Sequence, residues 1–185
     1  MLMSSRKTAF MLPAFLAFFM TGTGLLASGD LPETVRKNIA GDPECRDYDA
    51  SHLKDARQVV QLTENHTLYL LPCFTGAYNV IYRVYVLDRR YPEEVRASMF
   101  AGYSDDMGWY GQNQLINAHF DEKTQTLTAF EKGRGLGDCG SVPTYTWNEY
   151  GWRLVKYRHW GKCDGSRMPE DWPVIFDFRK RATAR

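Results

Sequence analysis

The stretch Thr126–Trp160, TLTAFEKGRGLGDCGSVPTYTWNEYGWRLVKYRHW, decides the fold of this chain. Within it, the runs Val142–Asn148 and Trp152–Trp160 are rich in β-branched and aromatic residues, and only Glu149–Gly151 separates them. A separator this short predicts a hairpin, so the two runs should pair antiparallel. Aromatic residues alternate onto both faces of the hairpin, which predicts that both faces are covered, as in a barrel or a two-sheet stack.

The same kind of segment recurs on both sides of this hairpin. Short β-rich runs alternate with turn residues from Arg57 onward. The further runs are Gln58–Leu62, Thr67–Pro72, Asn79–Asp88, Val95–Ala101, Gln114–Asp121, Thr126–Glu131 and Pro173–Arg179. We therefore predict an all-β fold, an antiparallel barrel or two-sheet stack of about eight or nine strands.

The segment before the strands has a different character. Asp30 can cap a helix, Pro32 suits its first turn, and Gly41 ends it, so a short N-terminal helix is predicted. The predicted organisation is a helical lead-in over residues 30–56, a β domain over 57–180, and a solvated basic tail over 181–185.

The first 29 residues have the pattern of a signal peptide. Arg6 and Lys7 form a positive start, and the apolar stretch Ala9–Met20 is shorter than a membrane span. Small residues at 27–29 suit a signal peptidase. We expect a periplasmic or secreted protein that keeps no membrane span after the signal is removed.

The four cysteines all follow the predicted signal peptide. An even number of cysteines in an exported chain predicts two disulfides. Three pairings are possible, and we favour Cys45–Cys73 and Cys139–Cys163 because each joins neighbours in sequence. No two cysteines have the close spacing that a zinc site requires.

Composition excludes some classes of partner. The chain has 185 residues, 23 Lys and Arg against 22 Asp and Glu, and a net charge of +1. This balance lacks the basic surface that nucleic acid requires. The length suits one domain, which we expect to be a monomer without a cofactor.

The glycine-rich loop Lys132–Ser141 is the unusual segment of the sequence. It satisfies G-x-G-x-x-G, but a strand follows it rather than the helix that a dinucleotide site needs. The piece GDCGS also looks like the nucleophile loop of a chymotrypsin-like cysteine protease. That interpretation would leave Cys139 as a free thiol, and one of the other three cysteines would then have no disulfide partner. We therefore favour a turn that is held by a disulfide. No metal ligands and no catalytic residues are nominated.

Several motifs resemble a family of exported proteobacterial proteins that is known only as a domain of unknown function. They are TLYLLPCFTGAYN (67–79), LTAFEKGRGLGDCGS (127–141), YTWNEYGW (145–152) and Trp172–Pro173. The resemblance implies a periplasmic, disulfide-bonded β domain and supplies no catalytic residue or substrate.

Two classes of function remain. The favoured one is a non-enzymatic envelope protein that binds a protein or glycan, with Arg134, Asp138, Trp147 and Trp152 as candidate binding residues. The alternative is a hydrolase of the cell wall or another polymer, whose acid and base carboxylates the sequence does not identify. Arg134 and Asp138 are close enough in sequence to pair with each other, and we favour that internal role for them.

Overall fold

The computed structural model of the protein describes residues 31–179. The predicted signal peptide and basic tail lie outside these residues. In chain order the described elements are α1 (Glu33–Ala40), the 3-10 helix η1 (Ser51–Ala56), β1 (Gln58–Gln61), β2 (His66–Thr75), β3 (Val80–Asp88), β4 (Phe100–Ser104), β5 (Gly108–Gln112), β6 (Leu115–Ile116), β7 (His119–Asp121), β8 (Thr126–Thr128), β9 (Glu131–Lys132), β10 (Gly140–Asn148), β11 (Gly151–Trp160), the 3-10 helix η2 (Pro169–Asp171) and β12 (Val174–Asp177).

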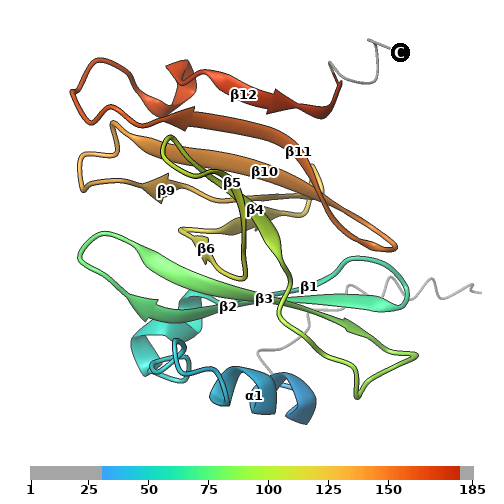
Figure 1. Ribbon diagram of the computed structural model, residues 1–185. Helices are drawn as coiled ribbons and strands as arrows, with labels where there is room; N and C mark the ends of the chain where they lie inside the picture. Colours follow the sequence, from blue (N-terminus) through green and yellow to red (C-terminus); the bar gives the residue numbers. More distant parts are fainter. Residues whose placement is uncertain (1–30, 180–185) are drawn as a thin grey trace, which may run out of the picture.

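These elements form three layers (Figure 1). A four-stranded sheet has the order β1-β2-β3-β6, and a six-stranded sheet has the order β12-β11-β10-β8-β7 with β9 beside β10. All the strand pairs are antiparallel. Helix α1 covers the outer face of the four-stranded sheet. The all-β prediction is therefore confirmed in its two-sheet form, with the short N-terminal helix.

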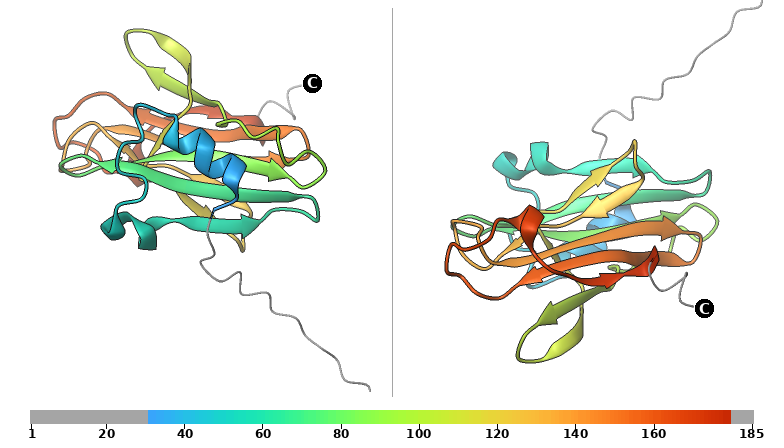
Figure 2. Two further views of the ribbon diagram at one scale, coloured as in Figure 1. Left: turned by 90° about the horizontal axis from the view of Figure 1, so that it is seen from below. Right: turned by 90° about the horizontal axis from the view of Figure 1, so that it is seen from above.

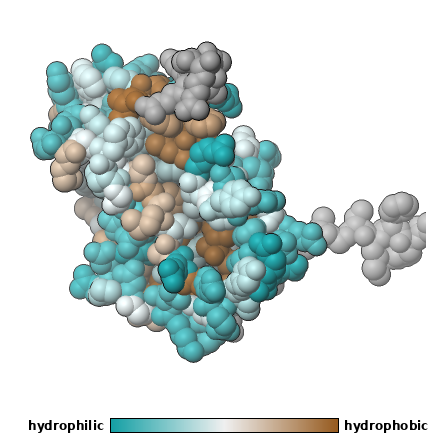
Figure 3. Space-filling view, turned by 45° about the vertical axis from the view of Figure 1, so that its right-hand side comes forward, coloured by the Kyte–Doolittle hydropathy of each residue, from teal (hydrophilic) through white to brown (hydrophobic). Residues whose placement is uncertain are grey.

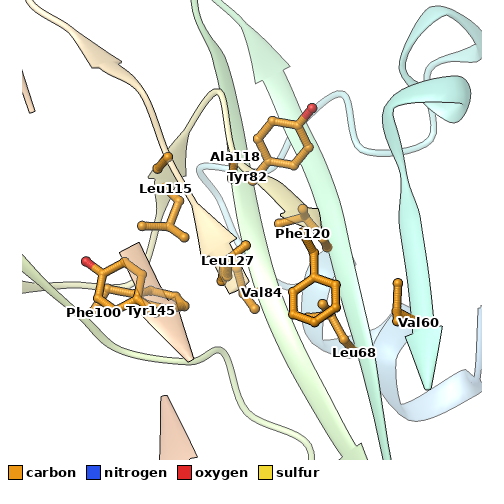
Figure 4. Close-up of a cluster of buried hydrophobic side chains, with 12 residues drawn as sticks. Val60, Leu68, Tyr82, Val84, Phe100, Leu115, Ala118, Phe120, Leu127 and Tyr145 are labelled. Atoms are coloured by element: carbon orange, nitrogen blue, oxygen red, sulfur yellow. The ribbon is translucent and has the colours of Figure 1, made fainter. Parts of the chain in front are cut away.

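Strand β2 explains the layering, because it is buried on both faces. Leu68 and Leu70 point into the core between the sheets, whereas Tyr69 and Leu71 point toward the helical lead-in. The core between the sheets also contains buried side chains of β3, β4, β6, β8 and β10 (Figure 4). A strand such as β2, whose central residues Leu68–Leu71 are all apolar and buried, therefore belongs in the middle layer.

Two side-chain amides connect the sheets where a closed barrel would have backbone pairing. The Gln58 amide of β1 donates to the Phe120 carbonyl at 3.1 Å and accepts from the Phe120 amide at 2.8 Å. Asn117 accepts from the Val80 amide at 2.9 Å and donates to the Phe130 carbonyl at 3.0 Å. Side-chain amides thus provide hydrogen-bond partners for backbone groups at these sheet edges. The two sheets remain a stack and do not close into a barrel.

Three predicted runs are not single strands in the structure, and one of them, Thr126–Glu131, is divided into β8 and β9. The predicted run Val95–Ala101 is not one strand, since residues 95–99 cross β3 with only a single bridge between Tyr85 and Ala97. The run Gln114–Asp121 is divided into β6 and β7 because Asn117 has a positive φ of 47°. Such breaks, together with the unpredicted strand β5, raise the described total to twelve strands.

Both predicted disulfides are confirmed. Cys45–Cys73 ties the helical lead-in to β2, and Cys139–Cys163 ties the glycine-rich loop to the segment after β11. Close to the first disulfide, the Arg83 side chain is only 1% exposed, and its Nε donates to Asp42 at 2.6 Å while its Nη2 donates to Glu44 at 2.5 Å. The lead-in is thus fixed to the sheet by a covalent bond and by a buried cation.

Candidate functional site

The β10–β11 hairpin separates the four candidate binding residues into two sites. Its register runs from Gly140 opposite Trp160 to Asn148 opposite Gly151. Arg134 and Asp138 lie in the loop that precedes the Gly140 end. Trp147 and Trp152 are paired at the turn end. The four residues therefore cannot contribute to one small binding site.

At the loop end, Arg134 and Asp138 bind each other. Nε of Arg134 donates to one oxygen of Asp138 at 2.7 Å, and Nη2 donates to the other at 2.5 Å. The second oxygen also accepts the Gly165 amide at 2.7 Å. The hydrogen bonds from Arg134 are the main reason that the pKa of Asp138 falls to about 2. Asp138 is only 4% exposed, so its carboxylate serves the loop itself.

The backbone of this loop accounts for its glycines. The amide of Gly137, whose φ is +69°, donates to the Arg134 carbonyl at 2.9 Å and closes a turn. Gly140 has a φ of +134°, and a Cβ there would lie 1.9 Å from the Glu131 carbonyl oxygen. Cys139 next to it is bound to Cys163, so it provides no free thiol for the cysteine-protease interpretation.

At the turn end, an open groove of about 580 Å³ lies beside the tryptophans. We call it the tryptophan groove. Its apolar lining consists of Val86, Met99, Trp147 and Trp152, and the rest consists of Glu94, Arg96, Ser98, Tyr150 and Gly151. The space-filling view shows that the surface carries apolar patches framed by hydrophilic residues (Figure 3). The groove combines both kinds of side chain.

The aromatic side of the groove is firmly supported. The rings of Trp147 and Trp152 meet edge to face, with centroids 5.3 Å apart. Trp152 also packs against Phe100 and Phe120 of the core, each at 6.2 Å. Trp147 contacts the His66 ring at 5.4 Å. Packing on several sides fixes the orientation of both indoles before any ligand arrives.

The charged side of the groove is unpaired. Arg96 and Glu94 are exposed, and within residues 31–179 neither side chain has a hydrogen-bond or ion-pair partner. Nearby, Asp88 is paired, since Arg90 Nη2 donates to its carboxylate at 2.6 Å. An unpaired guanidinium and an unpaired carboxylate beside two tryptophans are groups that a ligand can engage.

A second polar cluster lies where the β4–β5 hairpin meets the six-stranded sheet. Ser141 Oγ is 3.0 Å from Nδ1 of His159, and Nε2 of His159 is 3.3 Å from Asp105. The order Ser–His–Asp resembles that of hydrolase triads. Ser141 is only 3% exposed, however, so its hydroxyl is out of reach of a substrate.

Glu131 lies in the same region. Its carboxylate accepts a hydrogen bond from Gln112 Nε2 at 2.7 Å, and the Tyr157 hydroxyl is beside it. Burial raises its pKa to about 7, although both of these neighbours favour the charged form. Glu131 can therefore exchange a proton near neutral pH.

Sequence reasoning missed Glu131, Arg96 and Glu94. Alternation could have placed Glu131 in β9, but its burial depends on Gln112, 19 residues earlier. Arg96 lies in the predicted strand Val95–Ala101 and Glu94 directly before it, where both would have been ordinary surface charges. Within the described part of the chain, no three His, Cys, Asp or Glu side chains are grouped closely enough to hold a metal ion. None of the helices in residues 31–179 is long and apolar enough to cross a bilayer.

Comparisons with known proteins give a family but no activity. An uncharacterised Escherichia coli K12 protein, YpfG, is 32% identical over 121 residues, which cover 65% of this chain. The match spans only 35% of the length of YpfG. No solved structure matches the chain. Residues 23–179 match the family described as proteins of unknown function, DUF1176, and the chain belongs to that family.

Proposed function

We propose that this protein is an exported, non-enzymatic binding protein of the cell envelope, and that its tryptophan groove takes a glycan. One observation carries the proposal: two rigidly packed tryptophans lie beside an unpaired arginine and an unpaired glutamate in an open groove. The two disulfides support export, because such bonds persist in oxidising compartments.

The chemistry of the groove favours a sugar. A saccharide presents apolar C–H faces, which suit indole rings, and hydroxyls that both donate and accept hydrogen bonds. Arg96 can only donate and an ionised Glu94 can only accept, so vicinal hydroxyls satisfy both. A simple anion or cation would engage one of the two and be repelled by the other. The neutral, hydroxyl-rich ligand is therefore the better match.

The hydrolase alternative has less support from the geometry. Its strongest candidates are the Ser141–His159–Asp105 cluster and Glu131, which has a raised pKa. Ser141 is buried, and Glu131 lies against Gln112 of β5 and Tyr157 of β11. Neither group lines the tryptophan groove. A binding role requires no reacting group there.

The test is a titration of the oxidised protein with triacetylchitotriose, followed by tryptophan fluorescence and calorimetry. We expect a fluorescence change, because Trp147 and Trp152 line the groove. Arg96→Ala and Glu94→Gln should each weaken binding roughly tenfold or more, as loss of a hydrogen bond to a charged group does. Melting temperature should not change, since neither side chain has a partner among residues 31–179.

The neighbouring exposed residues supply matched controls. Arg89→Ala and Glu93→Gln make the same chemical changes outside the groove and should leave affinity unaltered. Absence of any response to saccharides at millimolar concentration would reject the glycan proposal. Equal losses in the groove variants and in the controls would reject this groove as the site.

A further inference from the structure

The β4–β5 hairpin, residues 100–112, is an arm that side-chain contacts, rather than backbone pairing, attach to the rest of the fold. Its two strands pair with each other and, within residues 31–179, belong to neither of the larger sheets. The arm projects from the side of the stack (Figure 2). Because no backbone ladder continues from it into a larger sheet, side chains must hold it in place.

The attachment is made of a few polar contacts and one aromatic cluster. Three hydrogen bonds connect the arm to β9, β10 and β11: Tyr145 hydroxyl to Ala101 carbonyl at 2.8 Å, Tyr103 amide to Tyr157 hydroxyl at 3.0 Å, and Gln112 Nε2 to Glu131 at 2.7 Å. The Trp109 ring also packs edge to face against Tyr157 at 5.0 Å. Glu131 is the one acid among these hydrogen-bonding groups.

Within residues 31–179, no positively charged side chain is paired with Glu131 to balance an ionised carboxylate. The titratable groups that face it are Tyr110 from β5, Tyr145 from β10 and Tyr157 from β11. Burial is the main cause that raises the pKa of each tyrosine, so all three remain neutral at physiological pH. β6, which also packs against β9, consists of Leu115 and Ile116 only. A charged Glu131 would therefore favour water, and the arm is the cover that can move aside.

We propose that ionisation of Glu131 releases the β4–β5 arm from the six-stranded sheet, and that this release alters the tryptophan groove. The second clause rests on the proposed function. The closed form is most stable below the open-state pKa of 4.5, and the open, hydrated form gains as pH rises from there to about 7, where the closed form also ionises.

The connection to the groove is direct along the chain. Ser98 and Met99 line the groove, and β4 begins with the next residue, Phe100. The Phe100 ring packs against Trp152 at 6.2 Å and against Tyr145 at 4.9 Å. Movement of the arm would therefore displace Met99 and loosen one support of Trp152.

Hydrogen exchange of the purified, oxidised protein tests the release without any ligand. Protection factors of arm amides, Tyr103 above all, are compared at pH 5.5 and pH 8.5 with those of β2 and β3. A carboxyl pKa of about 7 when closed and 4.5 when open predicts that arm opening increases about thirtyfold over this range. Glu131→Gln should abolish the change, whereas Glu122→Gln, on an exposed turn, should retain it.

Several results would overturn the proposal. Arm protection that does not depend on pH in the wild type, or that keeps its pH dependence in Glu131→Gln, rejects the release. If Glu131→Gln does not fold, a ¹³C titration of the wild-type Glu131 carboxyl decides instead, and a midpoint near 4.5 rejects it. Titrations with triacetylchitotriose at both pH values test separately whether arm release alters the tryptophan groove. Arm release with unchanged affinity rejects the coupling, while no binding at either pH rejects the proposed function and leaves the arm result valid.

Discussion

Replacing Arg83 by methionine should remove a large part of the stability of the domain. The guanidinium is 1% exposed and binds Asp42 through Nε, Glu44 through Nη2 and Gln114 through Nη1. Methionine fills a similar length without donating hydrogen bonds. It would leave Asp42, whose side chain is largely buried, as a carboxylate without its cation.

The magnitude follows from this burial. Removing one partner of a buried ion pair costs about 3–5 kcal/mol, because the other charge remains desolvated. Glu44 adds little, since its side chain is mostly exposed and its pair is screened. For a domain of this size each kcal/mol lowers the melting temperature by about 2–4 °C, so a decrease of about 6–20 °C is expected.

The assay is urea and thermal unfolding of oxidised protein, with Arg89→Met as the matched exposed control. Burial opposes ionisation of Asp42, but the hydrogen bonds from Arg83 and from the Glu44 amide outweigh it and lower its pKa. A lowered carboxyl pKa contributes stability above about pH 3.8 that is lost as pH falls through the folded value. The difference between wild type and variant should therefore shrink in acid. A loss below about 1 kcal/mol at pH 7 would refute the reasoning.

Two further predictions concern the glycine-rich loop. Gly140→Ala should cost about 3–5 kcal/mol in urea unfolding, because its Cβ would meet the Glu131 carbonyl; Gly151→Ala, with a similar positive φ but open space around it, should cost clearly less. An equal loss in the two variants would mean that the clash is absent. Asp138→Asn should lower the melting temperature more than Arg134→Ala does, because Asp138 is buried and also holds the Gly165 amide. Neither change should alter glycan titrations, and a binding defect of Arg134→Ala with unchanged melting would assign this loop to a ligand instead.

The β10–β11 hairpin and the disulfides were predictable because the information is local. The hairpin is indicated by alternating aromatic residues on both sides of a short turn, and the disulfides by cysteines that are neighbours in sequence. Each of these signals lies within about 30 residues of sequence. The arm was not predictable in the same way. Gly108 and Gly111 mask the strand character of β5, and Val95–Ala101 imitates a strand although only Ala97 bridges to β3. Contacts between residues remote in sequence decide both that β5 forms a strand and that most of Val95–Ala101 does not.

The candidate site was predictable only in part, for a related physical reason. Trp147 and Trp152 are neighbours across a hairpin, and their pairing follows from register alone. Whether a charged residue beside them is paired depends on segments that are remote in sequence. Arg83 and Arg96 look alike in sequence, yet Arg83 is buried against two carboxylates, whereas Arg96 is exposed and has no side-chain partner among residues 31–179. Sequence composition does not distinguish these environments, and folding does.

The position of the arm between the two ends of the β10–β11 hairpin decides which site it can influence. The loop end is closed by the Cys139–Cys163 disulfide and by the Arg134–Asp138 pair, so little movement can pass into it. The turn end has no such staple and leaves Tyr150 96% exposed. The arm begins beside the groove at Phe100 and contacts the hairpin through Tyr145 and Tyr157. A change in the arm should therefore be felt at the groove, whereas the Cys139–Cys163 disulfide holds the glycine-rich loop in place although Glu131 borders it.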